Sequence, residues 1–347
     1  SMRDLLRKVS RSFYLTLRIL PQSINPQLSL AYLLARASDT IADTELIEAC
    51  RRVEALLQFR ESIRETCEGK KPRLPDLGDL SSARRTAAGE GNQAERTLLE
   101  NLGNILDALR EFSADDRRLI RSVLDTITRG QEMDLIRFRN ATADHIEALG
   151  TDAELDEYTY NVAGCVGEFW TRMCLAHVFP RAGLDESTLL NNGARFGQGL
   201  QLVNVLRDLP RDLRQGRCYI PLDRLAKHGL QPRDLLNADH MDRFRPLYEE
   251  YLRQTEDHLA AGWQYTTMLP VRCVRIRLAC SWPILIGVRT VEELRSSNVL
   301  DDRFHIRISQ SDTWRLILRT LALYPAPGIW KGIFDLTRTR RYGHPDN

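Results

Sequence analysis

The chain has 347 residues, and its 49 Lys and Arg nearly balance its 47 Asp and Glu, leaving a formal net charge of +2. This balance argues against a protein that mainly coats nucleic acid, because such proteins are strongly and locally basic. A hydrophobic content of 43% is ample for a large core and argues against a disordered chain.

Other classes of protein are also disfavoured. The longest apolar run, residues 279–288, is about half as long as a membrane-spanning helix requires. The seven cysteines and seven histidines form no metal-ligand or disulfide pattern, and the first residues do not resemble a signal peptide. We therefore expect a reduced, cytoplasmic, globular protein.

Helical periodicity dominates the chain. Apolar residues three and four positions apart predict helices over residues 98–112, 116–133 and 248–259. Ser113, with Asp116 three positions later, predicts an N-cap. Alternating β-branched runs closed by Asn-Gly or Asp-Gly turns are almost absent. The sequence therefore predicts an all-α protein.

One stretch departs from this pattern. Residues 69–93 hold prolines and glycines among charged residues, which predicts a long, weakly ordered surface loop. We find no internal repeat and no change of composition, so we expect residues 1–347 to form a single domain. Residues 331–341 mix apolar and basic side chains, which we interpret as ordinary helix surface rather than a segment resting on a membrane.

The helix predicted over residues 28–50 is apolar on most sides, yet one of its faces is polar. Tyr32, Arg36, Asp39 and Asp43 are spaced four, three and four positions apart, which aligns them on that face. A helix that is apolar nearly all round should be buried. Two carboxylates one turn apart in such a helix repel each other and are costly to desolvate.

A second helix, predicted over residues 196–212, repeats this arrangement. At spacings of four, three, four and four, its polar face carries Gly197, Gln201, Asn204, Asp208 and Asp212. A divalent cation with an anionic ligand would remove both costs, and Mg²⁺ is commonly held by one or two carboxylates plus substrate phosphate oxygens. Solvated surface carboxylates are the alternative. The spacing alone is not specific, because a third such pair, Asp152 and Asp156, lies in a polar stretch typical of a solvated helix start.

Residues within and after the second acidic pair affect its geometry and its ligand. Pro210 lies between the two aspartates and removes a backbone donor, so the sequence predicts that the helix kinks or ends there. Arg214 and Arg217 follow with guanidinium donors; Arg217 is the better candidate, whereas Arg214 also fits a solvated loop.

Two further segments could belong either to the same site or to the ordinary structure of the fold. Residues 10–14 would bring hydroxyl groups and a guanidinium group to the site, or would cap a helix. Residues 158–167 carry glycines one turn apart with Tyr160 on their face, which implies close helix contact or room for a ligand. Aromatic residues that could line an apolar cavity, or belong to the core, are Phe13, Tyr14, Phe169 and Trp170.

These residues lie in segments that resemble the squalene and phytoene synthases, which condense two prenyl diphosphates head to head. The segments follow the family's order and span most of the chain: RSFYLTLRILP, ARASDTIAD, ITRGQEMDL, YNVAGCVG and QLVNVLRDLPRDLRQGRCYIP. The resemblance implies an all-α isoprenoid-synthase helical bundle, with a central cavity walled by the helices that carry the two acidic pairs.

The resemblance also implies functions for individual residues. It places Mg²⁺ on Asp39, Asp43, Asp208 and Asp212. It places the substrate diphosphates on Ser12, Arg36, Gln201, Asn204, Arg207 and Arg217. Tyr160 would be a catalytic residue beside the reacting carbons, and Asp39 and Asp208 would act in catalysis through the metal.

The chain departs from the family's pattern at several positions. Many members carry an extra acid where this chain has Ala42 and Arg211, which bears on the number of metal ions. Eukaryote-type squalene synthases have a tyrosine directly before the Val-Ala-Gly, where this chain has Asn161; its Tyr160 stands one residue earlier, as in the carotenoid-type enzymes. We also expect no C-terminal membrane anchor like that of the eukaryotic enzymes.

The reaction implied begins when Mg²⁺ and arginines neutralise a diphosphate leaving group and an allylic C–O bond ionises. A second prenyl diphosphate attacks the cation, and proton loss to diphosphate oxygens or a tyrosine leaves a cyclopropyl diphosphate. After a second ionisation and rearrangement, hydride from NADPH gives squalene, whereas proton loss gives phytoene or dehydrosqualene. No G-x-G-x-x-G follows a strand, so NADPH would bind without a Rossmann unit.

We expect squalene formation from two farnesyl diphosphates, with phytoene or dehydrosqualene as the alternative product. A chain-elongating or cyclising enzyme is a further alternative. A non-catalytic helical scaffold would have no reason to bury four carboxylates. The expected partners are prenyl diphosphates and not nucleic acid, with peripheral contact at the inner membrane face for the apolar product. Substrate chain length and oligomeric state stay open.

Overall fold

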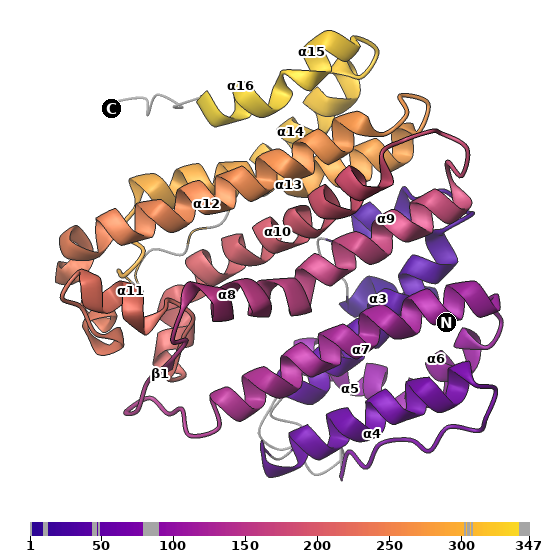
Figure 1. Ribbon diagram of the computed structural model, residues 1–347, viewed down its shortest axis with the longest axis horizontal. Helices are drawn as coiled ribbons and strands as arrows, with labels where there is room; N and C mark the ends of the chain where they lie inside the picture. Colours follow the sequence, from indigo (N-terminus) through magenta and orange to yellow (C-terminus); the bar gives the residue numbers. More distant parts are fainter. Residues whose placement is uncertain are drawn as a thin grey trace. The chain divides into compact units, whose positions relative to one another are not determined.

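The computed structural model describes residues 2–9, 13–43, 47, 49–78, 90–301, 303, 306 and 308–339. Most of these residues are helical, which confirms the predicted all-α class (Figure 1). The chain divides into two compact units. The first comprises residues 1–139 and 168–181, and the second comprises residues 140–167 and 182–347. The expectation of a single domain stays a prediction.

The first unit is built around α3. Its helices are α1 (Met2–Val9), α2 (Phe13–Arg18), α3 (Asn25–Asp43), α4 (Ala49–Cys67), α5 (Glu90–Glu100), α6 (Leu102–Leu109), α7 (Ala114–Arg137) and most of α9 (Cys165–His177). Apolar residues such as Leu34, Ala37 and Ile41 are buried on α3, which packs against α4, α5, α6 and α7. α4 also lies along α7 (Figure 1).

α7 begins where the sequence predicts. The Ser113 side chain accepts a hydrogen bond from the backbone N–H of Asp116 at 3.1 Å, so the predicted cap is confirmed. Asp116 is itself only 4% exposed. Its carboxylate accepts a hydrogen bond from Gln27 at 3.1 Å and lies 2.6 Å from Nε2 of His177. Because a buried carboxylate is costly without partners, this cluster ties α3 and α9 to the start of α7.

Between α4 and α7, two boundaries differ from the sequence prediction. α5 begins at Glu90, inside the expected loop, because the residues that follow are mostly good helix formers; residues 79–89 of that loop lie outside the described residues. The helix expected over residues 98–112 is divided at Asn101. The Asn101 side chain donates to the carbonyl oxygen of Thr97 at 2.7 Å and so competes with the helical backbone.

The second unit is built around α10, which packs along α12 and α13 (Figure 1). Its elements are α8 (Asp152–Thr159), the π-helical turn η2 (Tyr160–Gly164), α10 (Glu186–Arg214), α11 (Leu222–Lys227), the 3₁₀ turns η3 (Pro232–Leu236) and η4 (Ala238–His240), α12 (Met241–Met268), α13 (Val274–Ser296), α14 (Gln310–Leu323), α15 (Pro327–Lys331) and α16 (Ile333–Thr339).

Two short strands, β1 (Glu147–Ala148) and β2 (Arg217–Cys218), pair in parallel with Glu147 opposite Arg217. Strands of two residues have no periodicity that a sequence could reveal. The turn between α10 and β2 requires glycine: Gly216 has φ +80°, and a Cβ there would lie 2.3 Å from the carbonyl oxygen of Thr142.

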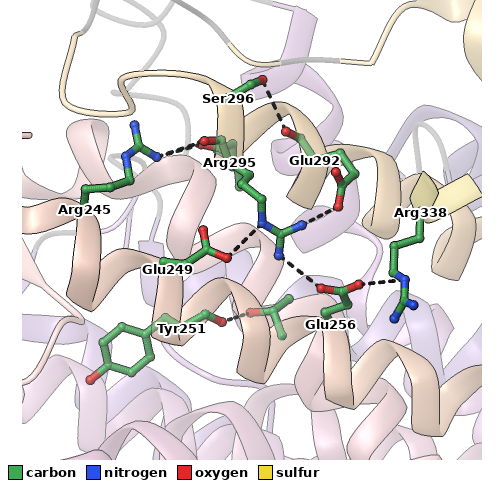
Figure 2. A network of polar contacts seen from close by, with 10 residues as sticks. Arg245, Glu249, Tyr251, Glu256, Glu292, Arg295, Ser296 and Arg338 are labelled. Carbon is green, nitrogen blue, oxygen red and sulfur yellow. Dashed lines mark hydrogen bonds and ion pairs between the residues drawn. The ribbon is translucent and has the colours of Figure 1, made fainter. Parts of the chain in front are cut away.

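Ion pairs join α13 and α16 to α12 (Figure 2). From α13, Arg295 binds Glu249 at 2.9 Å and Glu256 at 3.1 Å, and it also pairs with Glu292. Arg338 of α16 pairs with Glu256 at 3.4 Å. Arg295 is only 28% exposed and serves three acids at once, so we expect this cluster to stabilise the unit more than isolated surface pairs do.

The C-terminal segment expected to be helix surface is helical as far as Thr339, and residues 340 and 341 lie outside the described residues. Ile333 and Phe334 are buried, and α16 packs against α13. Among the described helices, none is both long enough and apolar enough to cross a membrane.

Candidate active site

The first acidic pair lies at the C-terminal end of α3. α3 ends at Asp43, earlier than the sequence predicts, so Asp39 and Asp43 occupy its last turns. The helix dipole disfavours carboxylates there, and α3 has no basic residue in its last turn to offset them. Tyr32 and Arg36 are half-buried on the same polar face. The placement costs stability, which points to a function.

Polar side chains from two other helices contact Asp39 and Arg36. Gln131 of α7 donates a hydrogen bond to Asp39 at 2.5 Å. Arg36 lies between two acids, 3.8 Å from Asp39 and 2.9 Å from Glu95 of α5. Sequence reasoning missed Glu95 entirely, and it quoted Gln131 within the ITRGQEMDL segment without giving it a function.

The electrostatics of the pair are unfavourable. Desolvation by the surrounding protein raises the pKa of Asp39 to about 6; Arg36 and the Gln131 hydrogen bond oppose this rise, whereas Asp43 and Glu95 add to it. The Asp39 side chain nevertheless keeps 47% of its surface accessible, so an ion can reach it. A carboxyl group that is partly desolvated but still accessible is suited to binding a cation.

The described side chains around the acidic pairs offer few protein ligands to a metal ion. Within the described part of the chain, no group of three or more His, Cys, Asp or Glu side chains is arranged to hold a metal ion. Mg²⁺ does not need one, because one or two carboxylates plus phosphate oxygens suffice. The acidic pairs therefore fit Mg²⁺ that arrives with a diphosphate better than a metal held by protein alone.

The second acidic pair lies on α10 in the other unit. Arg207 donates two hydrogen bonds of 2.9 Å to the Asp208 carboxylate and a third, of 3.1 Å, to the side-chain oxygen of Asn204. The hydrogen bond to Asp208 is the main cause that raises the pKa of Arg207. Three predicted site residues are thus brought together. Asp212 follows one turn later and is half-buried.

The sequence predicts that the helix kinks or ends at Pro210; α10 continues through Pro210 to Arg214, so it does not end there. Proline removes the N–H that would bond to the carbonyl oxygen of Leu206. The Tyr248 hydroxyl from α12 donates to that oxygen instead, at 3.1 Å. A tertiary contact therefore satisfies the carbonyl oxygen that the proline leaves without a helical donor.

One tyrosine adjoins the polar face of α10 and stacks on a second tyrosine. Gln201 donates to the Tyr158 hydroxyl at 3.3 Å, and the Tyr158 ring stacks on Tyr219 with centroids 4.6 Å apart. Sequence reasoning had not singled out either ring. Tyr160, the predicted catalytic residue, is the first residue of the π-helical turn η2, and π-helical turns are frequent at functional sites.

Glycines bring η2 and the start of α9 close to α10. A Cβ on Gly167 would lie 1.8 Å from the carbonyl oxygen of Gly193, and one on Gly197 would lie 2.1 Å from that of Ala163. Such distances are impossible for a real Cβ, so these glycines serve close helix packing, as one reading of the sequence held. This packing holds the turn that begins with Tyr160 against α10.

The other predicted residues have different surroundings. Arg217 is half-buried in β2, and Arg214 is exposed. Phe169 is buried and Trp170 half-buried. Ser12 lies outside the described residues, as do the side chains of Phe13 and Tyr14.

The third acidic pair differs from its expected description. α8 does begin at Asp152, with Thr151 as its cap. However, Asp152 is not simply solvated, because it accepts hydrogen bonds from Tyr251 at 2.6 Å and Arg224 at 3.0 Å. Asp152 is therefore neutralised by its own neighbours.

Comparison with known proteins agrees with these observations. The family model described as squalene/phytoene synthase matches residues 6–310. The chain belongs to the squalene/phytoene synthase family. It is therefore a prenyltransferase of the head-to-head type, as the sequence predicted.

Relatives within the family include both kinds of synthase. The chain is 23% identical to squalene synthase of Cyberlindnera jadinii over 99% of its length and 72% of the relative. It is 26% identical to squalene synthase ERG9 of Saccharomyces cerevisiae over 68% of its length, spanning about half (48%) of that relative. It is 41% identical to phytoene synthase of Thermus thermophilus, over 25% of its length and 27% of the relative.

Solved structures of the family share the fold. TcSQS in complex with E5700 matches 99% of this chain and 92% of its own, with a TM-score of 0.75 and 20% identity. A dehydrosqualene synthase in complex with a ligand matches 94% of this chain and 95% of its own, with a TM-score of 0.64 and 18% identity. The predicted isoprenoid-synthase helical fold is confirmed.

Proposed function

We propose that the chain condenses two farnesyl diphosphates through a cyclopropyl diphosphate to squalene, with Mg²⁺ and NADPH. Asp39, Asp43, Asp208 and Asp212 would hold the Mg²⁺. The observation that carries the proposal is the state of Asp39, whose pKa is raised to about 6 on a helix end that already disfavours it. A fold selected for stability alone would not keep this carboxyl.

Bound Mg²⁺ would supply positive charge to neutralise a diphosphate leaving group. The remaining steps rest on the chain's own side chains. Arg36 and Arg217 would donate to diphosphate oxygens, as would Gln201 and Asn204. Arg207 would do the same once its guanidinium leaves Asp208. Ser12 completes the proposed diphosphate-binding set.

The proton lost on forming the cyclopropane needs an acceptor near the reacting carbons. We assign this position to Tyr160, with its hydroxyl or a diphosphate oxygen receiving the proton. The Tyr158 hydroxyl accepts a hydrogen bond from Gln201 of α10, and the Tyr158 ring stacks on Tyr219. Such ring faces stabilise cations, so the pair is suited to the border of a carbocation site.

Phytoene or dehydrosqualene formation without reduction is the second candidate. It is favoured by Tyr160, which stands where the carotenoid-type enzymes carry their tyrosine, and by the phytoene synthases among the relatives. No described residue is assigned to NADPH, whose use is proposed on the resemblance and on the names of the squalene synthase relatives. We also propose a cytoplasmic location with peripheral contact at the inner membrane face, where an apolar product would leave.

Product analysis separates these candidates. The purified chain is incubated with farnesyl or geranylgeranyl diphosphate and Mg²⁺, with and without NADPH. Squalene formed from farnesyl diphosphate only in the presence of NADPH supports the proposal. An unreduced product with a central triene, formed without NADPH, supports the second candidate. Product from one allylic diphosphate alone, or only with isopentenyl diphosphate, would instead indicate a cyclising or chain-elongating enzyme.

A further inference from the structure

The turn of α10 that carries the second acidic pair lacks one of its backbone hydrogen bonds. Pro210 has no N–H, so the carbonyl oxygen of Leu206, four residues earlier, has no helical donor. Asp208 lies within this turn, and Asp212 follows Pro210. The direction in which the two carboxylates point relative to each other therefore depends on a turn that the helix alone does not hold.

A single side chain supplies the missing donor. The Tyr248 hydroxyl of α12 donates to the Leu206 oxygen at 3.1 Å. Tyr248 and Leu206 are both 0% exposed, so no bulk water can replace this bond. Burial raises the pKa of Tyr248 far above its ordinary value, and the phenol stays protonated as a donor.

Tyr248 is itself held in place. Its ring packs on Phe244 with centroids 5.4 Å apart, and the Arg245 guanidinium lies 6.0 Å from its centroid. Arg245 in turn donates to backbone carbonyl groups at the end of α13, beside the Arg295 cluster (Figure 2). The ring that carries the donor is therefore held by neighbours on α12, and through Arg245 by the end of α13.

We propose that Tyr248 is a positioning residue for Asp208 and Asp212: its hydroxyl replaces the backbone donor that Pro210 removes and so fixes the turn between the two carboxylates. The inference rests on the proposed function, because it gives those carboxylates a ligand to hold. The Tyr248 hydroxyl bonds a backbone oxygen rather than either carboxylate. It acts through the backbone of Leu206.

The test is a cycle of variants: Tyr248→Phe, Pro210→Ala and the double variant. Binding of Mg²⁺ with inorganic diphosphate is measured by calorimetry, and amide hydrogen exchange is followed over residues 206–214. Tyr248→Phe should weaken Mg²⁺–diphosphate binding about five- to tenfold, the scale of one buried hydrogen bond, and speed exchange in that segment. Adding Pro210→Ala restores an N–H opposite Leu206, so the double variant should return to within about twofold of the parent.

Tyr251→Phe is the matched control, because it removes a tyrosine hydroxyl from the same helix that bonds Asp152 rather than α10. It should leave Mg²⁺–diphosphate binding unchanged. Equal binding by Tyr248→Phe and the parent, or a double variant no better than Tyr248→Phe, would overturn the proposal. A parent chain that binds no Mg²⁺–diphosphate would overturn the proposed function and the positioning role with it. Exchange over residues 206–214 would still show whether the hydroxyl holds the turn.

Discussion

Asp39 lowers the stability of the folded chain, and we propose that it does so because it binds Mg²⁺ in the active site. Its pKa lies near 6 in the folded chain, against about 3.9 for an unfolded aspartate. Between these values the folded chain binds more protons than the unfolded chain, so the free energy of unfolding falls as the pH rises through this window. The cost is fully present above about pH 6 unless a cation offsets it.

Asp39→Asn should remove this cost. Without Mg²⁺ at pH 7.5, we expect the variant to be more stable than the parent by about 1 kcal/mol, a value reduced for the partial exposure of the side chain. At pH 4 the difference should vanish. Urea unfolding at the two pH values measures it, with the exposed Asp115→Asn as control. A variant that is less stable at pH 7.5 would contradict this account of the carboxyl.

Arg207 competes with any cation for Asp208, because it holds both carboxylate oxygens. Arg207→Gln should therefore tighten Mg²⁺ binding in the absence of diphosphate, by about threefold or more for one charged hydrogen-bond pair. The variant should also weaken binding of Mg²⁺ together with diphosphate, since the released guanidinium would no longer be available to the anion. Calorimetry in both conditions tests the pair of effects, and a loss of affinity in both would count against the competition.

At the scale of elements, glycine packing sets the distance between η2 and α10. Gly167→Ala or Gly197→Ala would place a Cβ against backbone, which cannot move as a side-chain end can. We expect each to lower the free energy of unfolding by about 3 kcal/mol or more. Gly328→Ala in α15 is the control, because nothing lies within 4 Å of its added Cβ. Denaturant unfolding that ranks all three alike would refute the packing argument.

The sequence predicted elements better than it predicted their partners. The Ser113 cap and the two polar faces depend on residues a few positions apart, and the structure has all three. Gln131 and Asp39 are 92 positions apart, and Tyr248 and Leu206 are 42 apart. No local pattern reports such contacts. For the same reason Pro210 was predicted to kink or end α10: local chemistry favours either outcome, and the donor to the Leu206 carbonyl oxygen comes from another helix.

At the scale of the whole molecule, acid should destabilise the chain through His258. Burial lowers its pKa to about 4, with Arg195 adding to the effect. Between about pH 6.5 and 4, His258 binds a proton in the unfolded chain but not in the folded chain. The free energy of unfolding therefore falls as the pH falls through this window.

His258→Gln should reduce this acid-induced loss of stability by about 1–2 kcal/mol between pH 7 and 4.5. Urea unfolding at the two pH values measures the change, with the exposed His145→Gln as control. If parent and His258→Gln lose the same stability over this interval, His258 is not the group responsible.

Everything proposed for this chain depends on its acidic pairs binding Mg²⁺ with a prenyl diphosphate. The most direct measurement is Mg²⁺-dependent release of inorganic diphosphate from farnesyl diphosphate by the parent, Asp39→Asn, Asp208→Asn and the control Asp156→Asn. We predict release by the parent and by Asp156→Asn, and a loss of at least about a hundredfold, roughly 2.7 kcal/mol in the barrier, in the other two. Release that does not need Mg²⁺, or that survives both Asp39→Asn and Asp208→Asn, would contradict the account.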